Sequence, residues 1–153
     1  ELVAPYYGGE AGVADRIDMS RAAATRYAET GEVSYIPAIS TTDESAAMFG
    51  PFDYYLDPQR GDIPEWDKRI AVMSWEPWLT FNPIDSASKV TVPVHMVHSR
   101  DGAVPDGAQL FFDALPGPKH IDWLPGTQLD FYDQPAQVDP AVAAVVEHFR
   151  HTL

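Results

Sequence analysis

Residues Val90 to Asp133 read VTVPVHMVHSRDGAVPDGAQLFFDALPGPKHIDWLPGTQLDFYD, and this stretch decides the fold. It begins with a β-branched, largely apolar run that ends at His98, and a second such run extends from His120 to Leu124. Between the two runs, apolar residues recur at the spacing of one helix face. Strand, helix and strand in this order predict two parallel strands joined by a right-handed crossover.

Helix signals flank the second run on both sides. Pro105 opens the helix between the strands, and Gly117 ends it. Asp139 and Pro140 are expected to open the final helix, whose apolar face consists of Val142, Val145, Val146 and Phe149. Two parallel strands alone leave long unpaired edges, so we expect further strands from the first half of the chain or from another polypeptide.

The first half of the chain has helical and aromatic character instead. We expect a helix over residues 10–29 that ends at Gly31, followed by helices over 43–49 and 64–75, with Pro77 ending or kinking the last of them. The pattern changes near residue 85. We therefore divide the chain into a helical, cap-like segment, residues 1–84, and an α/β half, residues 85–153.

The composition excludes several classes of partner. The 153 residues are 45% hydrophobic, which is enough for one domain with a core of its own. Ten Lys and Arg against 23 Asp and Glu give a net charge of -13, which repels phosphate backbones and anionic membrane surfaces. We therefore expect neither nucleic acid nor a membrane as a partner.

The chain has no cysteine, which excludes disulfides, thiolate metal sites and a cysteine nucleophile within it. This fits a reducing compartment. No apolar run approaches the roughly 20 residues that cross a bilayer, and no signal segment opens the chain. We therefore expect a cytoplasmic protein.

Asp101 lies where the first strand gives way to a loop, and functional groups of open α/β sheets gather just beyond the carboxyl ends of strands. A carboxylate there can accept the N–H of an imidazole and fix its orientation for general-base catalysis. The alternative is that Asp101 only caps a turn before Gly102. The loop that follows the second strand, Gly126 to Asp133, occupies the neighbouring position.

Three parts of the sequence together resemble the α/β-hydrolases, in particular the dienelactone-hydrolase-like and acyl-transferase-like subgroup. VPVHMVHSRDGAVP resembles the penultimate strand and acid turn, and ALPGPKHIDWLPGTQLDFYDQP resembles the last strand and the loop that usually carries histidine. IPEWDKRIAVMSWEPWLTF is similar to the aromatic cap helices of the subgroup. The resemblance implies the C-terminal portion of that fold, preceded by a mostly helical cap segment.

The resemblance also implies site residues. Asp101 corresponds to the acid of the catalytic triad, Gln128 falls on the position of the base, and Asp130 matches the Asp that often follows the histidine. An amide takes no proton near neutral pH, so Gln128 cannot act as a general base. The implied substrate is a small acyl or ester compound, and no cofactor is implied.

None of the serines lies in a G-x-S-x-G turn, which is where this fold carries its nucleophile. We therefore expect the nucleophile half to be absent, as in a truncated chain. The complete form is expected to hydrolyse or transfer an acyl group, whereas the isolated chain is expected to be inactive.

Aromatic and histidine side chains are further candidates. Trp66, Trp75 and Trp78 belong either to the wall of a substrate pocket or to the packing of a core. His98, at the end of a strand, either lines the site or packs.

We predict no metal site. His95 and His98 point to opposite faces of their strand. His148 and His151 share a helix face, but spacing supplies no third ligand.

Two other functions remain open. One is a non-catalytic binding or assembly module whose exposed sheet edge pairs with a partner chain or a second copy, because strands and a nucleophile are missing. The other is a small enzyme that uses His98 or a terminal histidine as its base.

Overall fold

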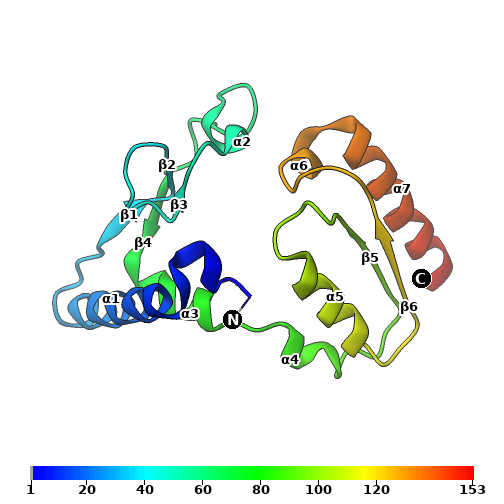
Figure 1. Cartoon of the computed structure of the whole chain (residues 1–153), viewed down its shortest axis with the longest axis horizontal. Coiled ribbons are helices and arrows are strands. Elements are labelled where there is room, and N and C mark those ends of the chain that lie inside the picture. The colour runs from blue at the N-terminus through cyan, green and yellow to red at the C-terminus, as the bar shows by residue number, and fades with distance from the viewer. Residues whose placement is uncertain (1) are drawn as a thin grey trace. The chain divides into compact units, whose positions relative to one another are not determined.

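The structure, a computed structural model, describes residues 2–153 and divides them into two compact units. The first unit contains residues 3–81, and the second contains Leu2 with residues 82–153. Figure 1 shows the elements of each unit in chain order. Among the helices of residues 2–153, none combines the length and the apolar character that crossing a membrane requires.

The first unit is built on one long helix, α1 (Gly9–Thr30), which follows a short 3-10 turn, η1 (Ala4–Tyr7). The helix ends where Gly31 adopts a left-handed conformation, with φ of 75°, and donates its N–H to the Tyr27 carbonyl. This confirms the helix expected over residues 10–29.

The helices expected over residues 43–49 and 64–75 were wrong. Each region instead contains one strand of a short pair: β3 (Met48–Phe49) runs parallel to β2 (Ile39–Ser40), and β4 (Arg69–Ala71) runs antiparallel to β1 (Tyr35–Pro37). Lys68 takes a left-handed φ of 59°, which is incompatible with a continuous helix through this segment. The helical spacing of a few apolar residues was therefore a weaker signal than strand pairing.

The remaining helices of the first unit are short: α2 (Asp53–Leu56), the 3-10 turn η2 (Val72–Ser74) and α3 (Trp75–Thr80). Pro77 lies inside α3 and does not end it. It is the third residue of the helix, in the first turn, where backbone N–H groups have no intrahelical partner and the missing N–H of proline costs little.

The core of the first unit forms where α1 meets η2 and α3. Trp75 is 2% exposed and packs with Ala23 and Val72. Ser20 of α1 is also buried, and its Oγ donates to the Met73 carbonyl at 2.7 Å while accepting the Glu76 N–H at 3.0 Å. A polar bridge thus accompanies the apolar contact.

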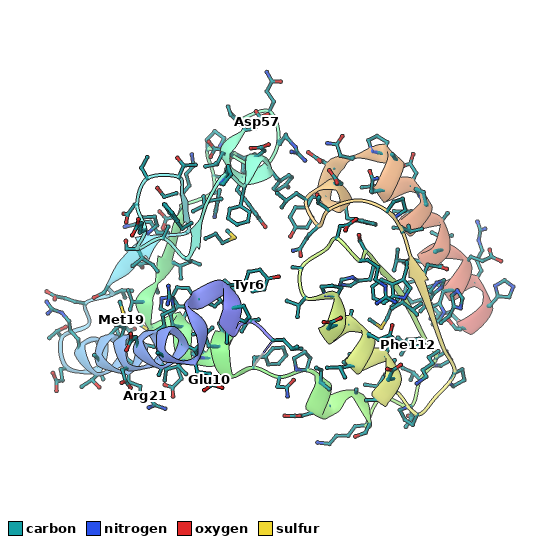
Figure 2. The ribbon with its side chains drawn as sticks, in the orientation of Figure 1. Tyr6, Glu10, Met19, Arg21, Asp57 and Phe112 are labelled. Carbon is teal, nitrogen blue, oxygen red and sulfur yellow. The ribbon has the colours of Figure 1, made fainter. Side chains whose placement is uncertain are left out.

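An exposed ion pair lies beside this bridge. Arg21, labelled on α1 in Figure 2, donates to Glu76 Oε1 from Nε at 2.9 Å and from Nη2 at 2.8 Å. The side-chain hydrogen bond and the charge of Glu76 raise the pKa of Arg21. An exposed pair of this kind contributes little stability, and it lies on the side of α1 that faces α3.

The second unit is the predicted alternation of strand and helix. Its elements are α4 (Ile84–Ala87), β5 (Val94–His98), α5 (Pro105–Ala114), β6 (Lys119–Trp123), α6 (Asp130–Asp133) and α7 (Pro135–Thr152). β5 and β6 are parallel, with His95 opposite His120 and His98 opposite Trp123. The two parallel strands and the crossover helix between them are therefore confirmed.

The start of the last helix was wrong. α7 begins at Pro135, four residues before the expected Asp139, so Pro140 lies inside the helix. Pro135 has the first helical position, and the Gln134 carbonyl accepts the N–H groups of Gln137 and Val138. The earlier proline therefore starts the helix, and the later one removes one hydrogen bond from it.

Within residues 2–153, β5 and β6 pair only with each other, apart from one isolated bridge. The strands of the first half form their own two-stranded sheets, β1 with β4 and β2 with β3. The first half therefore supplies no strand to the β5–β6 sheet among the described residues.

Candidate active site

The acid turn, Ser99–Gly102, and the final loop, Gly126–Asp130, leave the same end of the β5–β6 sheet, because both strands are parallel. An isolated parallel bridge joins Asp101 to Thr127 beyond the ends of the strands. The structure thus places the two segments against each other.

Ser99 connects the acid turn to the final loop through hydrogen bonds of its buried hydroxyl. The residue is 3% exposed, and its Oγ donates to the Gly126 carbonyl while accepting the Asp101 N–H at 3.0 Å. One residue earlier, the His98 carbonyl accepts the Leu124 N–H at 2.8 Å. The backbone that carries Asp101 is therefore held by both strands.

The carboxylate of Asp101 is exposed at the top of this turn. Among residues 2–153, no side chain donates a hydrogen bond to it, and only its backbone is bound. A carboxylate in this state has all its lone pairs available to accept the N–H of an imidazole.

Gln128 uses both ends of its amide within these loops. Its Oε1 accepts the Ala103 N–H at 3.2 Å, and its Nε2 donates to the Tyr132 Oη at 2.7 Å. The side chain therefore links the final loop to the residue just after the acid turn. What the geometry offers is a positioning contact, and an amide has no proton-accepting role here.

Asp130 fixes the shape of the final loop. Its Oδ2 accepts two hydrogen bonds from Thr127, one from the backbone N–H at 2.7 Å and one from Oγ1 at 2.8 Å. Asp130 is also the first residue of α6. Gly126, with φ of 121°, supplies the backbone conformation at which the chain enters the loop.

His98 is packed at the end of β5. Its Nδ1 lies 2.9 Å from both the backbone N and O of Ser99, and its ring contacts Trp123 edge-on at 5.5 Å between centroids. The Arg100 guanidinium lies over the same Trp123 ring, 3.4 Å from its centroid. His98 thus lies at the predicted end of the strand, half-buried beside Trp123, which also contacts Arg100.

The three tryptophans belong to the first unit. Trp75 is in the core and stacks on Trp78 at 5.5 Å between centroids, while Trp78 is 45% exposed. Trp66 is half-buried and contacts Tyr55 at 5.7 Å. The structure therefore gathers Asp101, Gln128, Asp130 and His98 at one sheet end, and separates Trp75 with Trp78 from Trp66.

Two solved structures resemble this chain. The structure of DcsB in complex with its substrate analogue superimposes with a TM-score of 0.71 at 16% identity, over 94% of this chain and 52% of that chain. The α/β-hydrolase GrgF from Penicillium sp. sh18 superimposes with a TM-score of 0.65 at 17% identity, over 95% of this chain and 50% of that chain. The fold is α/β-hydrolase-like.

The chain spans about half the length of each of these structures. No family model matches the sequence, and no curated protein matches it. The α/β-hydrolase-like fold agrees with the predicted class: the last two parallel strands with their helices, preceded by a mostly helical segment.

The structure also gathers residues that sequence spacing did not group. His95, His120 and Asp122 come together on one face of the β5–β6 pair. The signal lay in the strand register, because His95 and His120 are each the second residue of their strand.

Proposed function

We propose that the complete protein hydrolyses an ester or transfers an acyl group, and that this chain supplies the acid turn and the final loop of its site. The observation that carries the proposal is the bridge between Asp101 and Thr127, which brings those segments together in an α/β-hydrolase-like fold. The dienelactone-hydrolase-like or acyl-transferase-like subgroup fits the order of the motifs.

Each residue has a distinct role in this proposal. Asp101 accepts the N–H of an imidazole and stabilises the charge that forms as the base takes a proton. Gln128 and Asp130 hold the final loop in place through their hydrogen bonds to Ala103 and Thr127. The nucleophile and the base come from outside this chain.

Trp75 and Trp78 of the first unit form a stacked aromatic pair that is a candidate substrate surface. Trp78 is exposed and offers a ring face to an acyl group, and Trp75 supports it by stacking from the core. Trp66, also in the first unit, and His98, in the second, are half-buried and are further candidates for substrate contact.

An ester-hydrolysis assay of the 153-residue chain tests whether the chain is inactive by itself. Hydrolysis of p-nitrophenyl acetate is expected to equal the rate in buffer, and a fluorophosphonate probe is expected to label no serine. Asp101→Asn should leave that rate unchanged, as should His98→Ala. Turnover above buffer that disappears in either variant, with Asp106→Asn unaffected, would show that the chain contains a working site of its own.

A second function, a binding or assembly module, is favoured by one observation. β5 and β6 pair only with each other among the described residues, so strand edges are open to another polypeptide. Light scattering after size exclusion checks it across a range of protein concentrations. A monomer at every concentration excludes self-pairing, and concentration-dependent dimers support it.

A further inference from the structure

Three side chains from two strands converge on one face of the second unit. His95 lies on β5, whereas His120 and Asp122 lie two residues apart on β6 and so point to the same face. Each offers one ligand atom, and these atoms all lie within 4.8 Å of one another. The cluster is thus built on paired strands, which hold their backbone positions firmly.

Asp122 lies at the centre of the cluster. Its Oδ2 is 2.8 Å from His95 Nε2, and its Oδ1 is 3.0 Å from His120 Nε2. These hydrogen bonds hold the pKa of Asp122 below its usual value, so the carboxylate is ionised near neutral pH. Both imidazoles therefore present Nε2 toward a common anionic centre.

A third ring, that of His148 on α7, lies beside the cluster. His148 contacts the ring of His95 edge-on, with 5.8 Å between centroids, and His120 also contacts it edge-on at 4.8 Å. The side chain of His95 is 14% exposed, whereas that of His120 is 66% exposed. The cluster is therefore anchored at His95 and open to solvent at His120.

We propose that His95, His120 and Asp122 bind a divalent transition-metal ion of the zinc class, with water as the fourth ligand. Two imidazoles and one carboxylate are a donor set that zinc takes in tetrahedral sites with an open position. Bonds of about 2.0–2.1 Å place neighbouring ligand atoms about 3.4 Å apart in a tetrahedron. To hold one ion, the 2.8 Å and 3.0 Å contacts to Asp122 would have to widen, and the longer separation of up to 4.8 Å within the cluster would have to close.

Proton balance accompanies binding. In the metal-free cluster each Nε2 carries the hydrogen that it donates to Asp122. A metal takes the lone pair of a neutral Nε2, so the hydrogen moves to Nδ1 when the ring is neutral, and leaves to solvent when Nδ1 already carries one. No oxidation or reduction occurs, and the carboxylate exchanges two hydrogen bonds for one coordinate bond.

Titration calorimetry of the whole chain with zinc sulfate tests the proposal, with cobalt chloride as a spectroscopic probe of coordination. One zinc ion per chain is expected, together with the visible absorption of four-coordinate cobalt. His120→Ala removes an exposed side chain and should leave the fold intact by circular dichroism. It should weaken zinc binding by at least about 100-fold, beyond the 10- to 100-fold typical of changes outside the ligand set.

The controls distinguish this cluster from the other histidines. Asp122→Asn should weaken binding as much as His120→Ala, because an amide is a poor zinc ligand. His151 lies on α7, outside the cluster, and hydrogen-bonds to the Glu147 carbonyl at 2.9 Å. In the His151→Ala variant, zinc affinity should therefore stay within about 3-fold of the parent. No saturable binding, or binding that His120→Ala leaves intact, overturns the proposal.

Discussion

At the residue scale, the Ser99 hydroxyl joins the acid turn to the final loop. The residue is 3% exposed, and its hydroxyl lies between the Gly126 carbonyl and the Asp101 N–H. A buried donor or acceptor that loses its partner costs about 1–3 kcal/mol, because water cannot replace the missing hydrogen bond. The position of the Asp101 backbone therefore depends on Ser99. This serine does not lie in a G-x-S-x-G turn, so its role is structural.

Ser99→Ala should lower the free energy of unfolding by about 1–3 kcal/mol, since two backbone groups lose their shared partner. Urea unfolding followed by tryptophan fluorescence measures the change. Ser88→Ala is the matched control because Ser88 is exposed, and its free energy should stay within about 0.5 kcal/mol of the parent. Equal effects from both substitutions would show that the Ser99 hydroxyl does not support the turn.

At the scale of elements, Gly12 allows the 3-10 turn η1 to pack against the start of α1. A Cβ at this position would lie 1.9 Å from the Tyr7 carbonyl oxygen. Arg16 Nη1 donates to that same carbonyl at 3.0 Å and to the Gly12 carbonyl at 3.0 Å. The absence of a side chain at Gly12 therefore allows η1 to fold back on the first turn of α1.

Gly12→Ala should lower the free energy of unfolding by up to about 2 kcal/mol. Overpacking costs about 1–3 kcal/mol, and this clash is with backbone, which outweighs the roughly 1 kcal/mol that alanine gains in helix propensity. Thr25→Ala, on an exposed part of the same helix, should change stability by between zero and a gain of about 0.7 kcal/mol. A stabilised Gly12→Ala would mean that η1 does not lie against α1.

The elements also show what sequence alone could predict. Strong signals, such as Pro105 before an apolar stripe and β-branched runs, correctly predicted the order of β5, α5 and β6, although β5 begins at Val94 and not at Val90. The first unit was harder, because strands of two or three residues carry too few side chains for a period to be visible. Its long helix α1, with Gly31 at its end, was the exception.

The candidate site, like the fold, could be predicted from the sequence only in part. The order of acid turn and final loop is visible in the sequence, and so are Asp101, Gln128 and Asp130 as candidates. The tie through Ser99 is not visible, because it depends on the register of two strands separated by a helix. For the same reason His95 and His120 could not be paired by counting residues.

At the scale of the whole molecule, the chain has the fold of about half of an α/β-hydrolase, in two compact units. Its net charge of -13 disfavours polyanionic partners and is compatible with a small neutral acyl or ester substrate. The central claim is that Asp101 serves a base and a nucleophile that lie outside these 153 residues.

The most direct measurement of that claim uses the protein encoded by the full open reading frame, including whatever lies upstream of Glu1. We expect a nucleophile turn upstream, and Asp101→Asn should lower kcat for ester hydrolysis by about 10³- to 10⁴-fold, as loss of a triad acid does elsewhere. Asp106→Asn should leave kcat unchanged. An open reading frame without a nucleophile turn, or an Asp101→Asn protein with the parental kcat, would contradict the account.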